Sequence, residues 1–476
     1  QGSSRGSQCT LTRAMNNSLP KIQNDTAYYQ RNSSLDDSTK RENPSFVKSQ
    51  GEQQLLESFL TVDKMSAMKQ SNVNQSIRKK ESQGCTSVGN EPIWTLTDDD
   101  DDGEMSEVMS GGGRGGVRKE RPLKSWSDRA ILQAAEDVSG PECLVVLTHG
   151  TRLATALREL RSDLRFAFFT TEHFFARTLH SFHSDAGQSG AVSIHCAAEP
   201  PDGPFQSILF PTLAGDSSEV AQELFQSLQT RLVSGGRLIV STNAAKGHWI
   251  DSQLKAVFSR VEQQKFPRGH VFTAWKSGPL KRLRGFRARF DFRHQERVLV
   301  CETRPGVFSH RRLDGGARAL IRALSLVRDG QSSESVVERI VELGCGCGAV
   351  SAAAAVSFPQ AQILAIDSDA RAVECTAQTA RLNDLSQMQV VLDSEGTIPN
   401  PGQWDLLLGN PPYYSDFRIA ELFLQAARRA LRPGGQVLIV TKPVEWQEAR
   451  MKQLFHNVQA HRFGEYTVFS GQQKRP

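Results

Sequence analysis

The sequence predicts an α/β protein with two tandem Rossmann-like domains, preceded by a disordered tail. Three observations support this prediction. A strand, a glycine-rich turn and a helix follow one another around residue 344, similar segments recur about 200 residues apart, and the first 125 residues have a different composition from the rest. We expect four regions: a tail over 1–125, a first domain over 126–280, a basic strand and connector over 281–310, and a second domain over 311–476.

The tail is rich in Ser, Gln, Asn and Asp, and it contains an acidic run over 98–102 and a glycine tract over 111–116. Such a segment buries too little apolar area to offset the entropy lost on ordering, so we expect disorder there. The glycine tract and the arginines near it are interpreted as a solvated linker, although they also suit RNA contact.

Composition restricts the cellular setting. The net charge is only +5 over 476 residues, which is weak support for a nucleic-acid partner. No apolar run approaches the ~18 residues of a membrane span, and no signal-peptide core is present. The eight cysteines are scattered, which is typical of a reducing compartment. We therefore expect a cytoplasmic monomer that does not associate with membranes.

A glycine-rich loop lies between a predicted strand and a predicted helix. Residues 339–343 are mainly apolar, Gly344, Gly346 and Gly348 follow at every second position, and 349–356 is rich in alanine. Glycine lets the backbone turn tightly and lets a ligand approach closely. The helix N-terminus then offers N–H groups to an anionic group. This unit is typical of nucleotide-binding α/β sheets.

The next predicted strand, over 362–366, ends at Asp367, whose carboxylate can accept both hydroxyls of a ribose. A nicotinamide dehydrogenase shares these features, so they leave the cofactor open. Cys345 and Cys347 lie inside the loop, where the backbone turn requires only small side chains. No second cysteine pair completes a zinc site, so we predict no metal.

The tetrapeptide Asn410-Pro411-Pro412-Tyr413 follows another buried strand, over 404–409. Ligands of open α/β sheets bind at the carboxyl ends of the strands. The Asn410 side-chain oxygen and the Pro411 carbonyl can accept two N–H bonds from a planar amino group, which aims the nitrogen lone pair at an electrophile. Tyr413 can stack on a flat substrate. The predicted catalytic residues are Asn410, Pro411, Pro412 and Tyr413.

These motifs resemble the S-adenosylmethionine-dependent class I methyltransferases that act on planar amino nitrogens. A dehydrogenase would not need Asn-Pro-Pro-Tyr at this place. This resemblance implies that the glycines line the methionine part of the cofactor. It also implies that Asp367 holds the ribose and that Asp393 lies near the adenine. The implied cofactor residues are Glu342, Gly344, Gly346, Gly348, Asp367 and Asp393.

The two halves look like copies of one unit. Ser207–Pro211 corresponds to Leu407–Pro411, and the tripeptide Glu-Leu-Phe at 223–225 recurs at 421–423. Each tripeptide leads to a Gly-Gly pair and an apolar strand. A constant offset of this kind indicates internal duplication.

The first copy lacks the residues that suit catalysis. Phe210 stands where the second copy has Asn410, Thr212 replaces the second proline, and only Gly150 remains near the expected cofactor loop. We therefore interpret the first domain as pseudo-catalytic, with a role in supporting the fold or gripping the substrate.

Two tandem units, the first degenerate, resemble the ribosomal RNA guanine-N2 methyltransferases of the RsmC and RlmG type. The resemblance covers roughly residues 126–472. The connector agrees, because segments 305–309 and 313–316 resemble the part of that family that closes over the cofactor, which adds Asp314 to the implied cofactor residues. The family often has Phe-His after the two prolines, whereas Tyr413 and Tyr414 stand here.

A basic segment lies between the two halves. Phe290 and Phe292 alternate with Arg289, Asp291 and Arg293, and this period of two predicts a strand with one apolar face and one largely basic face. We expect it to bind RNA phosphates. The predicted RNA-binding residues are Lys281, Arg282, Arg284, Arg287, Arg289 and Arg293.

Together these observations predict methyl transfer from S-adenosylmethionine to the exocyclic N2 amine of a guanine in ribosomal RNA, with the small subunit favoured. Methylation of adenine N6 remains open, because the tetrapeptide alone does not exclude it. Methylation of a protein glutamine is disfavoured because release-factor methyltransferases resemble a single catalytic domain. A non-catalytic RNA-binding assembly factor is the alternative of another class.

Overall fold

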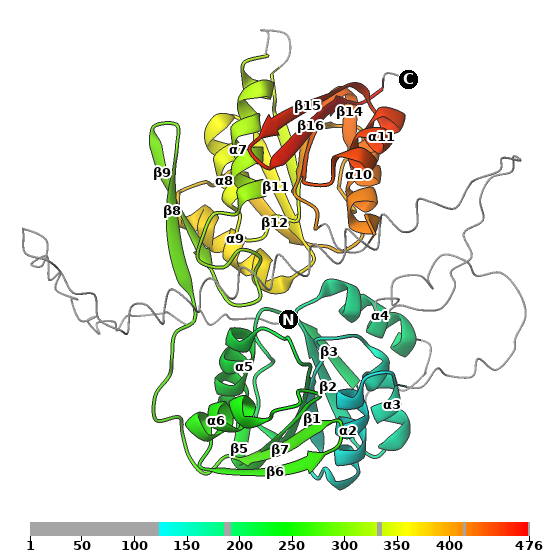
Figure 1. The fold of residues 1–476 in the computed structure, drawn as a ribbon, viewed down its shortest axis with the longest axis vertical. Helices are drawn as coiled ribbons and strands as arrows, with labels where there is room; N and C mark the ends of the chain where they lie inside the picture. Colours follow the sequence, from blue (N-terminus) through cyan, green and yellow to red (C-terminus); the bar gives the residue numbers. More distant parts are fainter. Residues whose placement is uncertain (1–122, 185–191, 331–335, 413–415, 475–476) are drawn as a thin grey trace, which may run out of the picture. The chain divides into compact units, whose positions relative to one another are not determined.

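The computed structural model describes residues 123–184, 192–330, 336–412 and 416–474. These residues form two seven-stranded sheets and a separate two-stranded hairpin. The prediction of two tandem Rossmann-like α/β units is therefore confirmed (Figure 1). Residues 1–122 of the predicted tail lie outside the described part of the chain, and the predicted domain boundaries stay predictions.

The first sheet has the strand order β3-β2-β1-β4-β5-β7-β6. Strands β1 to β5 are parallel, and β7 pairs antiparallel with both β5 and β6. The strands are β1 Glu142–Val146, β2 Arg165–Thr170, β3 Val192–Cys196, β4 Phe205–Thr212, β5 Leu232–Thr242, β6 Arg260–Phe266 and β7 Gly269–Trp275. The helices of this half are α2 Trp126–Ala134, α3 Arg152–Leu160, α4 His173–Ser184, α5 Ser218–Arg231 and α6 His248–Val257, with a 3-10 turn at Ala135–Asp137.

The second sheet repeats this order as β12-β11-β10-β13-β14-β16-β15, and its last strands are again antiparallel. The strands are β10 Arg339–Leu343, β11 Gln362–Asp367, β12 Met388–Leu392, β13 Trp404–Gly409, β14 Leu431–Thr441, β15 His456–Phe463 and β16 Tyr466–Gln472. The helices are α7 Gly315–Arg328, α8 Ala349–Ser357, α9 Ala370–Leu382, α10 Arg418–Ala430 and α11 Val444–Leu454. The shared strand order supports the duplication that the sequence indicates.

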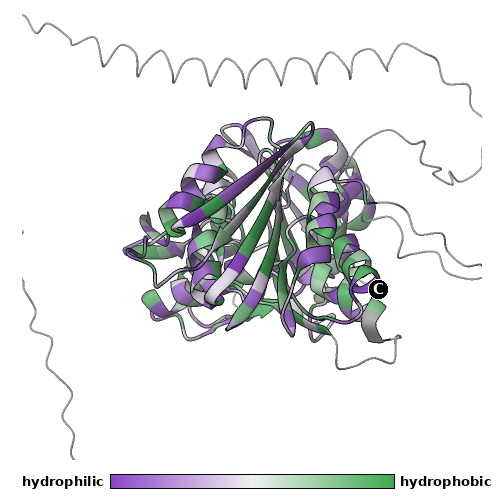
Figure 2. Ribbon diagram, turned by 90° about the horizontal axis from the view of Figure 1, so that it is seen from below, coloured by the Kyte–Doolittle hydropathy of each residue, from purple (hydrophilic) through white to green (hydrophobic). Residues whose placement is uncertain are grey.

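Hydrophobic strands and helix faces form the cores of both halves. Strands such as β13 are buried along their whole length, as expected for a parallel sheet that is covered on both faces. The alanine-rich helix α8 is almost wholly buried, and it packs with α7 against the second sheet. Figure 2 shows helices on both sides of the strands, with hydrophilic and hydrophobic positions alternating along them.

The predicted basic strand is β8, Ala288–His294, and it pairs antiparallel with β9, Arg297–Thr303. Phe290 and Phe292 are half-buried, whereas Arg289 and Arg293 are exposed, so the predicted alternation is confirmed. The hairpin packs on the second half. There, the side chain of Asn383 bonds both the N–H and the carbonyl of Val300, at 2.9 and 2.8 Å.

Arg304 joins the two halves. Its side chain is fully buried, and its guanidinium lies 2.5 Å from Glu199, 2.9 Å from Glu223 and 2.8 Å from Glu374. Glu199 and Glu223 belong to the first half, and Glu374 lies on α9 of the second. Burying this cation carries a desolvation penalty, which the three nearby carboxylates offset.

The observed elements differ from the predicted ones mainly in extent. Strand β15 had no predicted counterpart, and β14 begins at Leu431, before the Gly-Gly pair, with a register shift opposite Trp404. The Gly-Gly pair at 434–435 therefore lies inside the irregular start of this strand. None of the helices in the described ranges combines the length and hydrophobicity that a membrane span requires.

Candidate active site

The glycine loop connects β10 to α8 at the carboxyl edge of the second sheet. Gly344, Gly346 and Gly348 have φ angles of 70°, 57° and 79°, a region that L side chains rarely adopt. A Cβ at Gly348 would lie 2.9 Å from the Thr376 side chain, so this position also lacks room. A Cβ at Gly346 would meet nothing within 4 Å, so space for a ligand lies beside the loop.

Two carboxyl groups support this loop. Glu342 is buried, accepts a hydrogen bond from the Ser351 hydroxyl, and has its pKa raised to about 8 by burial. Asp367, at the end of β11, accepts the N–H of Gly346 at 2.8 Å and that of Asp369 at 3.0 Å. Burial raises the pKa of Asp367 to about 6. Asp367 therefore bonds the glycine loop directly, whereas Glu342 bonds the helix that follows it.

Asn410 and Asp314 meet although they are 96 positions apart. Nδ2 of Asn410 donates to Oδ2 of Asp314 at 3.1 Å, and the same oxygen caps α7 by accepting the N–H of Ala317 at 3.0 Å. A carboxylate only accepts hydrogen bonds, so this contact fixes the orientation of the amide and leaves Oδ1 of Asn410 available as an acceptor. The position of Asp314 beside Asn410 was not foreseen from the sequence.

Gly316 allows this close approach. A Cβ built at Gly316 would lie 2.9 Å from Oδ1 and 3.1 Å from Nδ2 of Asn410. Residue 316 is the second residue of α7, so the backbone of the helix start lies against the amide. The Leu-Asp-Gly-Gly pattern at 313–316 is the sequence signal from which this contact can be inferred.

The rest of the tetrapeptide is partly described. Pro411 is buried and Pro412 half-buried, while Tyr413 lies outside the described residues. Where the described chain resumes, Phe417 has a φ of 61° and stacks on Trp446 of α11, with ring centroids 4.5 Å apart and an interplanar angle of 12°. Positive φ in a bulky residue is strained and is often found near functional sites. This aromatic pair was not predicted from the sequence.

Asp393, which follows strand β12, stabilises the loop after that strand. Oδ1 of Asp393 accepts the backbone N–H groups of Glu395 and Thr397, at 2.9 and 3.0 Å. The first half reaches this edge, because Nδ1 of His173 lies 3.1 Å from the Ser394 hydroxyl. Contacts from the first half to this edge were also missed.

Glu172 makes a second contact of this kind. It lies just beyond the end of β2, as Asp367 ends β11, and it accepts a hydrogen bond from the Ser368 hydroxyl at 3.3 Å. Burial raises the pKa of Glu172 to about 7, with smaller contributions from the charges of Asp369 and Asp367.

The cysteines of the loop, Cys345 and Cys347, are buried. Cys347 packs with Cys301 of β9 and Cys375 of α9 in one apolar cluster. Among the described residues, no group of three or more His, Cys, Asp or Glu side chains is arranged to hold a metal ion.

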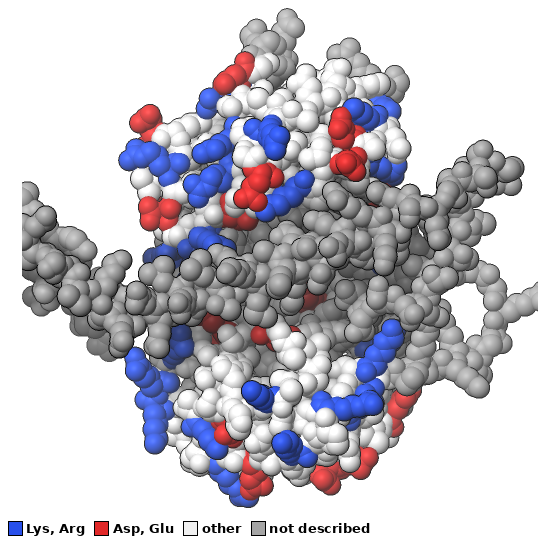
Figure 3. All heavy atoms as spheres, viewed as in Figure 1, with Lys and Arg blue, Asp and Glu red and all other residues white. Residues whose placement is uncertain are grey.

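The predicted RNA-binding residues are not equally available. Arg287 and Arg289 both pair with Glu302, each at 3.1 Å, and Arg287 also reaches Glu374 at 2.6 Å. The Arg284 guanidinium lies 4.9 Å from the centre of the Phe286 ring. Lys281, Arg282 and Arg293 are exposed. On the face shown in Figure 3, basic and acidic side chains are interspersed over both halves.

Comparisons with known proteins agree with this geometry. Residues 299–470 match the family model of the methyltransferase small domain. Ribosomal RNA small subunit methyltransferase C of Pseudomonas putida is 29% identical over 256 residues, which is 52% of this chain and 72% of that protein. Ribosomal RNA large subunit methyltransferase G of Streptomyces avermitilis is 34% identical over 157 residues, which is 32% of this chain and 39% of that protein.

A solved structure has the same fold. It is the 16S rRNA N2 methyltransferase RsmC of T. thermophilus, in complex with AdoMet and guanosine. The TM-score is 0.60 and the identity 19%, and the match covers 72% of this chain and 92% of that chain.

Proposed function

Because this chain is an S-adenosylmethionine-dependent methyltransferase of the RsmC and RlmG type, we propose that it methylates the exocyclic N2 amine of a guanine in ribosomal RNA. One observation carries the proposal: Asp314 holds the Asn410 amide with its oxygen available, at the carboxyl edge of the sheet beside the glycine loop. The small subunit is the favoured target, since the small-subunit relative is matched over 72% of its length and the large-subunit relative over 39%.

Asn410 and Pro411 would orient the substrate amine. In guanine the N2 lone pair is delocalised into the ring, so the amine is a poor nucleophile. Two N–H bonds, one to Oδ1 of Asn410 and one to the Pro411 carbonyl, favour a pyramidal nitrogen and direct its lone pair toward the methyl group. The proton can leave after methyl transfer, so the reaction requires no strong base. Tyr413 would stack on the base once it has left its helix.

The residues present suit the cofactor. Open space beside Gly346 suits the methionine part, and the half-buried Asp367 carboxylate suits the ribose hydroxyls. Asp393 would lie near the adenine. The cofactor supplies an electrophilic sulfonium methyl group. Asp314, predicted to contact the cofactor, has a further role in this proposal, because it orients Asn410.

The first half, over residues 126–280, would support the catalytic half without reacting. Its partner is ribosomal RNA or a ribosomal subunit. We further propose that the chain acts as a monomer in the cytoplasm.

The decisive experiment measures methyl transfer from labelled S-adenosylmethionine to unmodified ribosomal RNA and to small subunits, followed by nucleoside analysis. Wild type should place label in N2-methylguanosine. Asn410→Ala should lower the rate by about 10²–10³-fold, as expected when one group that stabilises the transition state is lost. Asp314→Asn should lower it by roughly tenfold, because the amide would lose its fixed orientation.

Gln459→Ala is the matched control, because it removes an exposed carboxamide from the edge strand β15. It should leave the rate unchanged. Label in N6-methyladenosine, or on a release factor, would overturn the substrate assignment. Equal rates for Asn410→Ala and the control would overturn the role of Asn410.

A further inference from the structure

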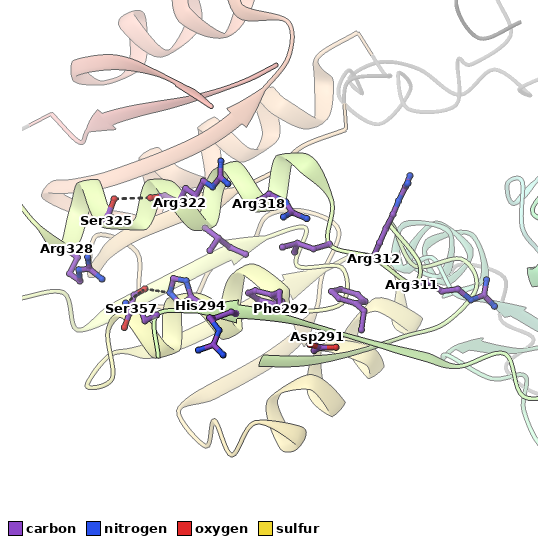
Figure 4. A pocket seen from close by; sticks show the side chains of 15 residues that line it. Asp291, Phe292, His294, Arg311, Arg312, Arg318, Arg322, Ser325, Arg328 and Ser357 are labelled. Atoms are coloured by element: carbon purple, nitrogen blue, oxygen red, sulfur yellow. Dashed lines mark hydrogen bonds between the residues drawn. The ribbon is translucent and has the colours of Figure 1, made fainter. Parts of the chain in front are cut away.

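A hollow of about 710 Å³ lies between helix α7 and strand β8, on the surface of the second half. Figure 4 shows Arg318, Arg322 and Ser325 along α7, with Phe292 and His294 of β8 on the other side. Arg311 and Arg312 lie at the end where α7 begins. The hollow is separate from the glycine loop and from the predicted cofactor residues, none of which lines it.

The lining is strongly basic. Asp291 is the only carboxylate among the lining residues, which include six arginines: Arg293, Arg311, Arg312, Arg318, Arg322 and Arg328. Arg311 pairs with Glu219, and Arg328 pairs with Asp329. The other four arginines have no ion pair within the described ranges, and all four are exposed. Their charge is therefore available to a ligand.

The base of the hollow is partly apolar. Phe292 and Leu313 are half-buried and Ile321 is buried, and all three belong to the core that α7 and α8 share. His294 is held by the Ser357 hydroxyl at 2.8 Å. Exposed guanidinium groups above a firm, partly aromatic base form a surface that suits a nucleic-acid strand better than a small anion.

Helix α7 connects the hollow with the candidate active site. Asp314 caps α7 and bonds Asn410, and Arg318 and Arg322 lie one and two turns further along the same helix. Residues four positions apart in an α-helix are separated by about 6 Å along the axis. RNA on either side of a base bound at Asn410 must cross the adjacent surface of the protein. Arginines at this place would contact its phosphates.

We propose that this hollow binds the phosphodiester backbone of the RNA strand next to the target base, with Arg312, Arg318 and Arg322 as its phosphate contacts. This proposal rests on the proposed function. It differs from the prediction based on the basic strand, because Arg287 and Arg289 are already paired with Glu302. Guanidinium groups recognise phosphates through paired hydrogen bonds, so lysine would be a weaker substitute here.

The test compares the double variant Arg318→Gln/Arg322→Gln with the matched control Arg268→Gln/Arg428→Gln, which removes two exposed arginines from elsewhere. Binding of unmodified ribosomal RNA is measured by fluorescence anisotropy at several salt concentrations. At about 0.1 M salt the double variant should bind roughly tenfold more weakly. The slope of log K against log salt should become less steep by about 1.4, as expected for two lost phosphate contacts on a single strand. Cofactor affinity should not change.

Arg312→Gln provides an independent variant in the loop before α7, and it should shift binding in the same direction. RNA binding by the double variant equal to that of the control would overturn the proposal. Weaker binding to assembled subunits with unchanged binding to naked RNA would also overturn it, and would assign the hollow to a ribosomal protein. Asn410→Ala separates the two proposals, because it should lower methyl transfer by about 10²–10³-fold while RNA binding persists.

Discussion

The two halves share one strand order, yet they end their fourth strands differently. In the first half, β4 continues to Thr212, and Phe210, Pro211 and Thr212 stay paired with β5. In the second half, the pairing of β13 with β14 ends at Gly409, one residue before Asn410. Because the chain leaves the sheet here, the side-chain amide of Asn410 and the carbonyl of Pro411 are not taken up by pairing with β14. The pairing of the fourth strand is therefore shorter in the half that carries the predicted catalytic residues.

The helices that lie over these two strand ends, α2 in the first half and α7 in the second, also differ. In the first half, Ser127 of α2 is fully buried and donates to the Thr212 carbonyl at 2.8 Å. Its counterpart in the second half is Gly316, which is also the second residue of its helix. The serine fills the space at the strand end, whereas the glycine leaves room for the Asn410 amide. At this strand end the first half is therefore packed with a side chain where the second half has a glycine.

Placing the residue of the first half in the second should have the largest effect. Asn410→Phe would remove the acceptor for the substrate amine, so we expect kcat to fall by about a thousandfold, or roughly 4 kcal/mol of transition-state stabilisation. The measurement is methyl transfer to unmodified ribosomal RNA under saturating cofactor. A fall of less than tenfold would show that the two strand ends do not differ in the proposed way.

The reciprocal substitution, Phe210→Asn, should lower the stability of the first half rather than the rate of methyl transfer. Phe210 is 2% exposed and meets Phe225 edge-on at 5.9 Å, so Phe210→Asn would leave a cavity and bury an amide. We expect the first half to lose about 4 kcal/mol of its free energy of unfolding, with methyl transfer per folded molecule nearly unchanged at low temperature. Denaturant unfolding and the methyl-transfer assay check this together. A variant that unfolds like wild type would contradict the packing argument.

The acidic strand ends of the two halves make stability depend on pH. The pKa of Glu172 is raised from 4.5 to about 7, mainly by burial, so folding favours the protonated carboxyl. Its contribution is fully present below pH 4.5 and is lost as the pH rises through 7. The maximum is about 3 kcal/mol. Glu172→Gln should flatten this fall in the free energy of unfolding.

Unfolding of wild type and Glu172→Gln at several pH values between 4 and 8 tests this expectation. Asp367 and Glu342 also have raised pKa values, but they are present in both proteins, so the difference isolates Glu172. Glu338→Gln, at an exposed position, is the control and should follow wild type. If the free energy of unfolding depends on pH in the same way in all three proteins, Glu172 does not cause the pH dependence.

A smaller change should partly close the active site. Gly316→Ser introduces the residue of the first half, and its Cβ would lie 2.9 Å from Oδ1 of Asn410. Displacing the amide by a fraction of an ångström should lower kcat by about 10–50-fold, or roughly 2 kcal/mol. Gly278→Ser, where a Cβ would meet nothing within 4 Å, is the control. Unchanged kcat would show that the helix start tolerates a side chain here.

Several parts of this protein follow from local sequence patterns. The strand before Gly344, the glycine loop and the alanine-rich helix were predictable because each depends on neighbouring residues. The tetrapeptide indicated the chemistry because few other reasons exist for Asn-Pro-Pro-Tyr after a buried strand. The two faces of β8 also follow from its sequence, because apolar and charged residues alternate along it.

Other parts depend on residues that are distant in sequence, and only the tertiary structure decided them. The pairing of Arg287 and Arg289 with Glu302 is set by the register of a hairpin, so the charge of the basic strand appeared more available than it is. The contact of Asp314 with Asn410 spans 96 positions and requires α7 to begin over the end of β13. The sequence by itself determined which residues are chemically capable, since side-chain chemistry and local periodicity are written in it. The tertiary structure decided which of them remain unpaired, because burial and ion pairing arise only when distant segments meet.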